Sequence, residues 1–273
     1  MGIWTIYTYS IAFMLGAVIG SFLNVCIYRI PAGLSIVKPR SRCGDCGKTL
    51  EALDLVPIFS WLFLRGKCRH CGAKIAARYP MVEALEGILF VVILSHFGIS
   101  WLTPIMWVFT AILTVVFFID LDHQIIPNKV VIFGLVAGLM PAVYHWISTA
   151  KGPTSFHRYP LYFSTAFYEP FLGAFVPFVL MLAMALLSLI FFKRSGLGMG
   201  DVKLYAVIGI FLGWQNALMS IWFAFFFGGL FGIIWIFILK KDKSAMIPFA
   251  PFIVIGTMVV MLWGHQIFQA IVL

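Results

Sequence analysis

The chain has 273 residues, of which 62% are hydrophobic and only 11% are charged, and its formal net charge is +9. A composition this apolar, with repeated uncharged runs of membrane-spanning length, excludes an ordinary soluble domain. The anionic inner leaflet of a membrane accounts for the excess of basic residues, so we expect no nucleic-acid partner.

Apolar runs separated by turn signals predict about eight transmembrane helices. The expected ranges are 3–28, 80–98, 101–120, 127–147, 170–192, 202–213, 217–239 and 246–271. The 202–213 run is short for a bilayer, so either it is tilted or the glycine-rich stretch before it also lies at membrane depth. We therefore expect an all-α polytopic membrane protein with a first helix (1–28), a cytoplasmic loop domain (29–79) and a multi-helix membrane domain (80–273).

The basic residues predict how the chain is oriented in the membrane. Residues 1–28 contain no Lys or Arg, whereas residues 29–79 contain ten. Because cytoplasmic loops collect Lys and Arg, we expect the N-terminus outside and the 29–79 loop in the cytoplasm. The turns at 120–126, 193–201 and 240–243 then also face the cytoplasm, and the 148–169 loop faces outward.

Two C-x2-C pairs stand in this loop, within RSRCGDCGKTL and GKCRHCGAKI. Each pair lets two thiolates converge on one ion, and the glycine after each pair permits the tight turn that this requires. The spacing favours a zinc ion held by Cys43, Cys46, Cys68 and Cys71. Disulfides are the alternative, which a loop in the reducing cytoplasm disfavours.

Between the two pairs lies an apolar run, PIFSWLFL, at residues 57–64. A loop of this size cannot build a large core, so a metal would stabilise it instead. The run either fills a miniature core inside the loop or lies against the membrane interface or a partner. The sequence supports both interpretations equally.

Acidic residues are few and fall near the ends of the predicted spans. They are Glu83, Glu86, Asp120, Asp122 and Asp201, all of which the expected topology places at the cytoplasmic edge. Two carboxyls held close together can share one proton, and such a pair can hydrolyse a peptide bond through an activated water. Asp201 could instead only cap a helix, and Asp122 could be a solvated charge at a helix end.

Five ordered motifs together resemble one family. They are GSFLNVCIYRIP (20–31), the paired C-x2-C loop, RYPMVE (78–83), IDLDHQIIPN (119–128) and GMGDVK (198–203). In this order, over residues 16 to 213, the chain closely resembles the bacterial type IV prepilin peptidases, which are GxGD intramembrane aspartic proteases. The pair CGDC, where the family often has Cys-Pro-x-Cys, is a small departure that leaves the acidic residues unaffected.

The resemblance implies that the protein removes the short basic leader of type IV prepilins or pseudopilins at the cytoplasmic face of the inner membrane. It implies Asp120 and Asp201 as the catalytic pair, with Asp122 a competitor for the first position. Many members then methylate the new N-terminus with S-adenosylmethionine. The motifs also mark supporting and cofactor-binding candidates: Gly198, Gly200, Lys203 and Glu83 in support, and Gly20, Ser21, Asn24 and Arg29 for S-adenosylmethionine, unless these last four only pack helices together.

Two functions of other classes compete with proteolysis. A proton- or ion-coupled transporter could use Asp120, Asp201 and Glu83 as a relay, but transporters place such groups near the midplane, often within repeated halves. A thiol redox protein could use the C-x2-C pairs, but it would need them to face an oxidising partner. The clustering of the acids at one edge favours the peptidase.

Overall fold

The structure is a computed structural model that describes residues 2–149, 168–192, 197–238 and 247–272. The described elements are helical, as the sequence predicts, and the loops expected at 148–169 and 240–243 lie largely outside these residues. The helices are α1 (Ile3–Arg29), α2 (Phe59–Phe63), α3 (Arg78–Phe97), α4 (Leu102–His123), α5 (Asn128–Thr149), α6 (Glu169–Phe192), α7 (Met199–Ile233) and α8 (Ala250–Val272), with a 3₁₀ turn η1 (Ala52–Leu55) and a π-helical turn η3 (Ile234–Ile238).

Among the described residues, six helices are long and apolar enough to cross a membrane. The expected spans 202–213 and 217–239 fall on one of them, α7, whose backbone leaves helical geometry at Gly213 (φ 79°, ψ 161°). Together with η3 this stretch has 40 residues. If straight it would measure about 60 Å, twice the hydrocarbon thickness of a bilayer. The break at Gly213 is where the sequence predicts a turn, and the count of eight crossings stays a prediction.

By its contacts the chain forms two compact units, Met1–Val115 and Val116–Leu273, and we describe each by itself. The first contains α1, the 29–79 loop, α3 and most of α4. The second contains the last turns of α4 and all helices from α5 to α8. The division into 1–28, 29–79 and 80–273 stays a prediction about topology.

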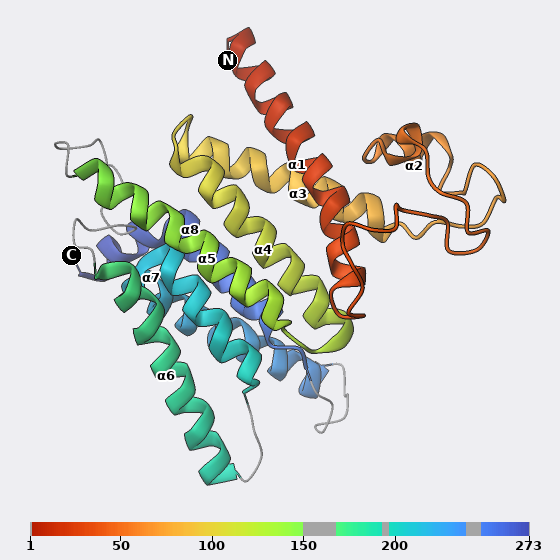
Figure 1. The fold of residues 1–273 in the computed structure, drawn as a ribbon. Coiled ribbons are helices and arrows are strands. Elements are labelled where there is room, and N and C mark those ends of the chain that lie inside the picture. The colour runs from red at the N-terminus through yellow and green to blue at the C-terminus, as the bar shows by residue number, and fades with distance from the viewer. Residues whose placement is uncertain (1, 150–167, 193–196, 239–246, 273) are drawn as a thin grey trace. The chain divides into compact units, whose positions relative to one another are not determined.

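In the first unit, α1 crosses α3 (Figure 1) at positions where only small residues fit. A Cβ on Gly16 would lie 2.8 Å from the Cα of Gly87, and one on Gly20 would lie 2.8 Å from the Cα of Glu83. Because lipid provides little hydrophobic drive between helices, close backbone approach of this kind holds them together.

In the second unit, α7 packs against α5, α6 and α8 (Figure 1). Glycines lie at each of these crossings. A Cβ on Gly209 of α7 would overlap the carbonyl oxygen of Gly173 in α6, one on Gly134 of α5 would meet Val207, and one on Gly256 of α8 would meet the backbone of Ala224. The N-terminal half of α7 is accordingly the buried centre of this unit, and the side chains of Val202, Tyr205, Val207, Ile208, Phe211 and Leu212 have no exposed surface.

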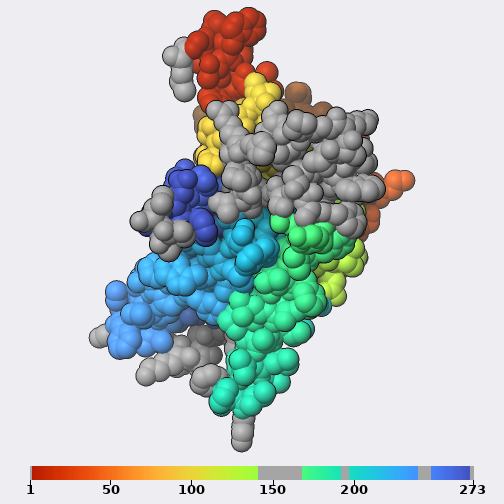
Figure 2. Space-filling model, turned by 90° about the vertical axis from the view of Figure 1, so that its left-hand side faces the viewer, coloured from red at the N-terminus to blue at the C-terminus, as the bar shows by residue number. Residues whose placement is uncertain are grey.

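The outer side of α6, which lies beside α7 in Figure 2, carries large exposed apolar side chains. Phe175, Ile190 and Phe191 are 64%, 70% and 75% exposed. Such a surface would promote aggregation in water, whereas it is ordinary for a helix that faces lipid.

The crossing of α6 and α7 can be tested with Gly209→Ala. Alanine favours a helix by up to about 1 kcal/mol over glycine. At position 209, however, the new methyl group would meet the backbone of Gly173, which cannot rotate away. We expect a net destabilisation of about 1–3 kcal/mol, seen as a lower unfolding temperature in detergent.

Gly229→Ala on the same helix is the matched control, because a Cβ at position 229 meets nothing within 4 Å. It should leave the unfolding temperature unchanged or slightly raised. Equal effects of the two substitutions would show that the glycine at 209 is not needed for the crossing.

Candidate functional site

Asp120 lies in the last turn of α4 and is only 5% exposed. Its Oδ2 accepts a hydrogen bond from the backbone N–H of Ala250 at 3.0 Å. Ala250 is the first residue of α8, so this N–H is one of those that a helix leaves without a partner in its own backbone. Asp120 therefore caps α8, and its carboxyl lies where the helix dipole favours a negative charge.

Asp201 is the third residue of α7 and is 8% exposed. Its Oδ2 accepts a hydrogen bond from the N–H of Gly198 at 3.2 Å, while its own N–H donates to the Gly198 carbonyl at 3.0 Å. Asp201 thus also lies at a helix N-terminus. The two carboxyls are close enough for the charge of Asp120 to act on Asp201.

The segments that carry the two aspartates pack directly on each other within the second unit. A Cβ on Gly200 would lie 3.0 Å from the Cβ of Ile126, so only glycine allows this approach without a shift. One turn further along α7, Lys203 Nζ donates to Asn128 Oδ1 at 3.0 Å. The motifs IDLDHQIIPN and GMGDVK therefore form one site at the start of α7.

The remaining acidic candidates have different surroundings. Asp122 is exposed at the end of α4. Glu83 belongs to the first unit, where it accepts a hydrogen bond from the Ile58 N–H at 2.6 Å and lies beside the Ser21 side chain. Glu86, in the same unit, is fully buried and accepts a hydrogen bond from Thr114 at 2.7 Å.

The sequence did not suggest any part for Ala250. Its backbone N–H carries the contact, and a backbone group leaves no mark on residue identity. A weak signal was present in IPFAPF (247–252), because a proline at 251 fits the first turn of a helix and so places a helix start, with its free N–H groups, close to Ala250.

An apolar surface depression of about 500 Å³ lies at the start of α6 and is lined by Tyr168, Phe171, Leu172 and Phe175. It contains none of the candidate residues, and we do not assign it to the site.

The four paired cysteines come together in the loop of the first unit. Their sulfur atoms all lie within 4.8 Å of one another, and those of Cys43 and Cys71 are 3.9 Å apart. Tetrahedral zinc with Zn–S bonds of about 2.3 Å places its sulfurs about 3.8 Å apart. The cluster can therefore hold a metal such as zinc.

The two C-x2-C turns have the same pattern of backbone hydrogen bonds. Cys43 N–H donates to the Lys48 carbonyl and Cys68 N–H to the Ala73 carbonyl, at 2.9 and 2.8 Å. Gly47 and Gly72 complete the turns with φ angles of 68° and 72°, which favour glycine. The sequence prediction of glycine-closed turns is thus confirmed.

Electrostatics in the cluster also fit a cation. The backbone N–H groups of Cys71 and His70 lower the pKa of the Cys68 thiol to about 7. Although the N–H of Ala73 favours its thiolate, desolvation and the neighbouring sulfurs raise the pKa of Cys71 to about 12. Four thiolates so close together repel one another, and a divalent cation removes that repulsion.

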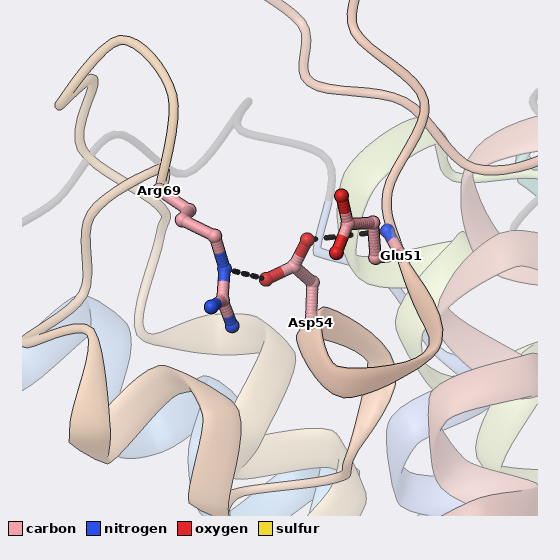
Figure 3. Close-up of polar contacts among 3 residues, drawn as sticks. All are labelled: Glu51, Asp54 and Arg69. Carbon is pink, nitrogen blue, oxygen red and sulfur yellow. Dashed lines mark hydrogen bonds and ion pairs between the residues drawn. The ribbon is translucent and has the colours of Figure 1, made fainter.

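A salt bridge ties the second turn to η1 (Figure 3). Arg69 Nε donates to Asp54 Oδ1 at 2.7 Å, and the Glu51 N–H donates to Asp54 Oδ2 at 3.1 Å. Desolvation acts against these bonds, yet they hold the pKa of Asp54 below its ordinary value. The contact is therefore intact at neutral pH and is lost only as the pH falls through that lowered value.

The four residues proposed from the sequence for S-adenosylmethionine lie on or at the end of α1. Gly20 packs against Glu83, Ser21 lies beside the Glu83 carboxyl, and Asn24 Nδ2 donates to the Tyr79 carbonyl at 3.1 Å. Arg29 donates to the Ser35 carbonyl at 2.9 Å. The face of α1 that bears Gly20, Ser21 and Asn24 thus packs against α3.

The fold and the site together define a helical membrane protein with a buried pair of aspartates. Each carboxyl of the pair is held by an N–H at the start of a helix. The Bacterial Peptidase A24 N-terminal domain matches residues 14–97, and the Type IV leader peptidase family matches residues 107–233. The chain belongs to the Type IV leader peptidase family.

Its relatives include several proteins named prepilin leader peptidase/N-methyltransferase. The chain is 32% identical to the one from Stutzerimonas stutzeri, covering 94% of this chain and 91% of the relative. It is 34% identical to that of Bacillus subtilis, covering 94% and 95%, and 40% identical to that of Myxococcus xanthus, covering 81% of this chain but 61% of the relative. No solved structure matches the chain.

Proposed function

We propose that the protein is an aspartic endopeptidase of the inner membrane that removes the basic leader from type IV prepilins or pseudopilins. Asp120 and Asp201 are its catalytic pair. The observation that carries the proposal is the meeting of the two acid-bearing motifs at the start of α7, where each carboxyl has one oxygen held by a backbone N–H. Membership of the Type IV leader peptidase family supports the same reaction.

The geometry suits general acid–base hydrolysis. Each anchored Oδ2 fixes its carboxyl, so the second oxygen can face water and substrate. One aspartate takes a proton from water, whose oxygen attacks the scissile carbonyl carbon, while the other, protonated, donates to the carbonyl oxygen. The first aspartate then gives its proton to the leaving nitrogen as the C–N bond breaks, and the second takes a proton back from one hydroxyl of the intermediate, which becomes the carboxylic acid.

The proposed substrate fits the expected topology. With the N-terminus outside, the ends of α4, α7 and α8 that carry the site face the cytoplasm. A prepilin with a positive leader and an apolar helix can keep the helix in the bilayer while its polar end reaches the inner edge. A transporter relay is not supported, because the acidic pair lies at helix ends and the family consists of peptidases.

Replacement of either catalytic aspartate by asparagine tests the pair. Asp120→Asn and Asp201→Asn keep the size of the side chain but remove the ionisable oxygen, so each should slow leader removal by about 10⁴-fold or more. The double variant should be hardly slower than either single one, because the two act as a unit. The measurement is cleavage of a prepilin in detergent, followed on a gel.

Asp122→Asn is the matched control, since Asp122 is exposed on the same turn of α4. It should cleave within about tenfold of the unchanged protein. Loss of cleavage with Asp122→Asn but not with Asp120→Asn would transfer the first catalytic position to Asp122. Full activity of Asp201→Asn would end the proposal of a dyad.

The substitution Ala250→Pro removes the N–H that binds Asp120. Proline lacks the donor and is tolerated in the first turn of a helix. Hydrogen bonds to charged groups contribute about 1.5–3 kcal/mol, so we expect cleavage to fall roughly 10- to 100-fold.

Ala250→Val provides the control for bulk, because position 250 is fully buried and valine retains the N–H. Unfolding temperatures of both variants show whether each is folded. If valine slows cleavage as much as proline does, the effect comes from packing, and the N–H has no part in orienting Asp120.

The cluster of Cys43, Cys46, Cys68 and Cys71 is proposed to hold zinc. Four thiolates within 4.8 Å of one another suit a closed structural zinc site with no open position for substrate. Bound zinc would cross-link the two C-x2-C turns. The hydrogen bonds within each turn already orient its cysteines. The loop would otherwise have little core to keep it folded.

The purified protein should therefore carry about one zinc ion per chain. Substitution of any of the four cysteines by serine should remove it, whereas Cys26→Ser should not, because Cys26 is buried in α1 outside the cluster. Elemental analysis of protein prepared under reducing conditions is the measurement. Stable disulfides and no metal in such protein would refute the assignment.

N-methylation appears in the names of the relatives, and it implies S-adenosylmethionine as the methyl donor for them. Gly20, Ser21, Asn24 and Arg29 remain the candidates for this chain. Because α3 already packs against the face of α1 that bears the first three, we derive no methyl-transfer step through them.

A further inference from the structure

Three large apolar side chains of α2 face away from the loop that carries them. Phe59, Leu62 and Phe63 are 54%, 56% and 84% exposed. We call these three residues the α2 patch. Single exposed apolar residues are common, but three within one short helix form a surface that requires a partner.

The α2 patch is not needed for the loop's own core, because another residue of the same helix fills it. Trp61 Nε1 donates to the Ile75 carbonyl at 3.0 Å. Its ring lies against Gly66, where a Cβ would come within 2.9 Å of it. The apolar run at 57–64 is thus divided, with Trp61 turned into the loop and the α2 patch turned outward.

A hydrogen bond joins the start of α2 to α3. The N–H of Ile58, the residue before α2, donates to Glu83 Oε2 at 2.6 Å. Ile58 has a φ of 63°, which a β-branched residue adopts only when its surroundings impose it. Glu83 lies about 8 Å along α3 from its first residue, Arg78. Because α3 is a candidate membrane span, α2 begins beside a helix that is entering the bilayer.

The charge around the α2 patch indicates which partner it meets. The 29–79 loop has ten basic residues and three acidic ones. Arg65 and Lys67, which directly follow α2, are exposed. This arrangement attracts an anionic surface and repels a basic peptide, so it suits lipid headgroups and not the leader of the proposed substrate.

We propose that the α2 patch is an interfacial membrane anchor. Phe59, Leu62 and Phe63 insert at the boundary between headgroups and acyl chains, and Arg65 and Lys67 contact anionic headgroups. The anchor holds the four-cysteine cluster at the membrane surface. This inference does not depend on the proposed peptidase activity, because it rests on the exposure, depth and charge of α2.

Photo-crosslinking of the full chain tests the anchor. A benzophenone amino acid placed at Phe63 reacts with C–H groups in contact with it. In vesicles of phosphatidylethanolamine and phosphatidylglycerol, irradiation should join position 63 to phospholipid, detected by mass spectrometry of the peptide. The yield should fall when phosphatidylcholine replaces phosphatidylglycerol, because the headgroup charge is lost.

The same amino acid at Asp45, an exposed acid between Cys43 and Cys46, is the control, with metal content showing that both proteins are folded. Burial of an apolar side chain in the membrane favours the inserted state over the exposed one by about tenfold or more. Lipid adducts at position 63 should therefore exceed those at 45 by at least that factor. Equal yields at the two positions would overturn the proposal. So would adducts at 63 only to a second copy of the chain or to added prepilin.

Discussion

The close approach of α7 to its neighbours is the constraint on which the second unit depends. Gly173 and Gly209 bring α6 and α7 into backbone contact, Gly256 does the same for α8, and Gly134 of α5 lets the side chain of Val207 approach closely. Helices in lipid gain little from burying apolar side chains against each other, so contacts of this kind have to be tight. Since Asp201 is in the first turn of α7, the packing that fixes this helix also fixes one of the two carboxyls.

The second constraint comes from the acids themselves. A carboxyl in an apolar interior is costly unless protein groups replace the water it has lost. Asp120 and Asp201 meet this need in the same way, each through an N–H at the start of a helix, α8 for one and α7 for the other. Helix starts are where backbone N–H groups remain available, which explains why the pair lies at helix ends and not in the middle of a span.

Local patterns in the sequence were enough to predict much of this arrangement. The helical spans, the break at Gly213 and the two glycine-closed cysteine turns each depend on residues that are close in the chain. The contact between Ala250 and Asp120 joins positions 130 residues apart through a backbone group, so neither residue type nor spacing could reveal it. The sequence also could not show that the 57–64 run is divided between the loop core and an outward-facing surface. A core segment and an interfacial segment have the same apolar composition, and only the direction of Trp61 distinguishes them.

The cysteine loop shows how a segment too small for a core of its own can still take a definite position. Its two turns converge on a cluster that can hold a metal, and Arg69 ties the second turn to η1 through Asp54. These contacts fold the loop but do not place it relative to the membrane helices. Glu83 of α3 does that, because its carboxyl accepts a hydrogen bond from the Ile58 N–H of the loop at 2.6 Å while Gly20 of α1 packs against its backbone. An acid that the sequence offered as part of a transport relay is thus the link between the loop and the helices that carry it.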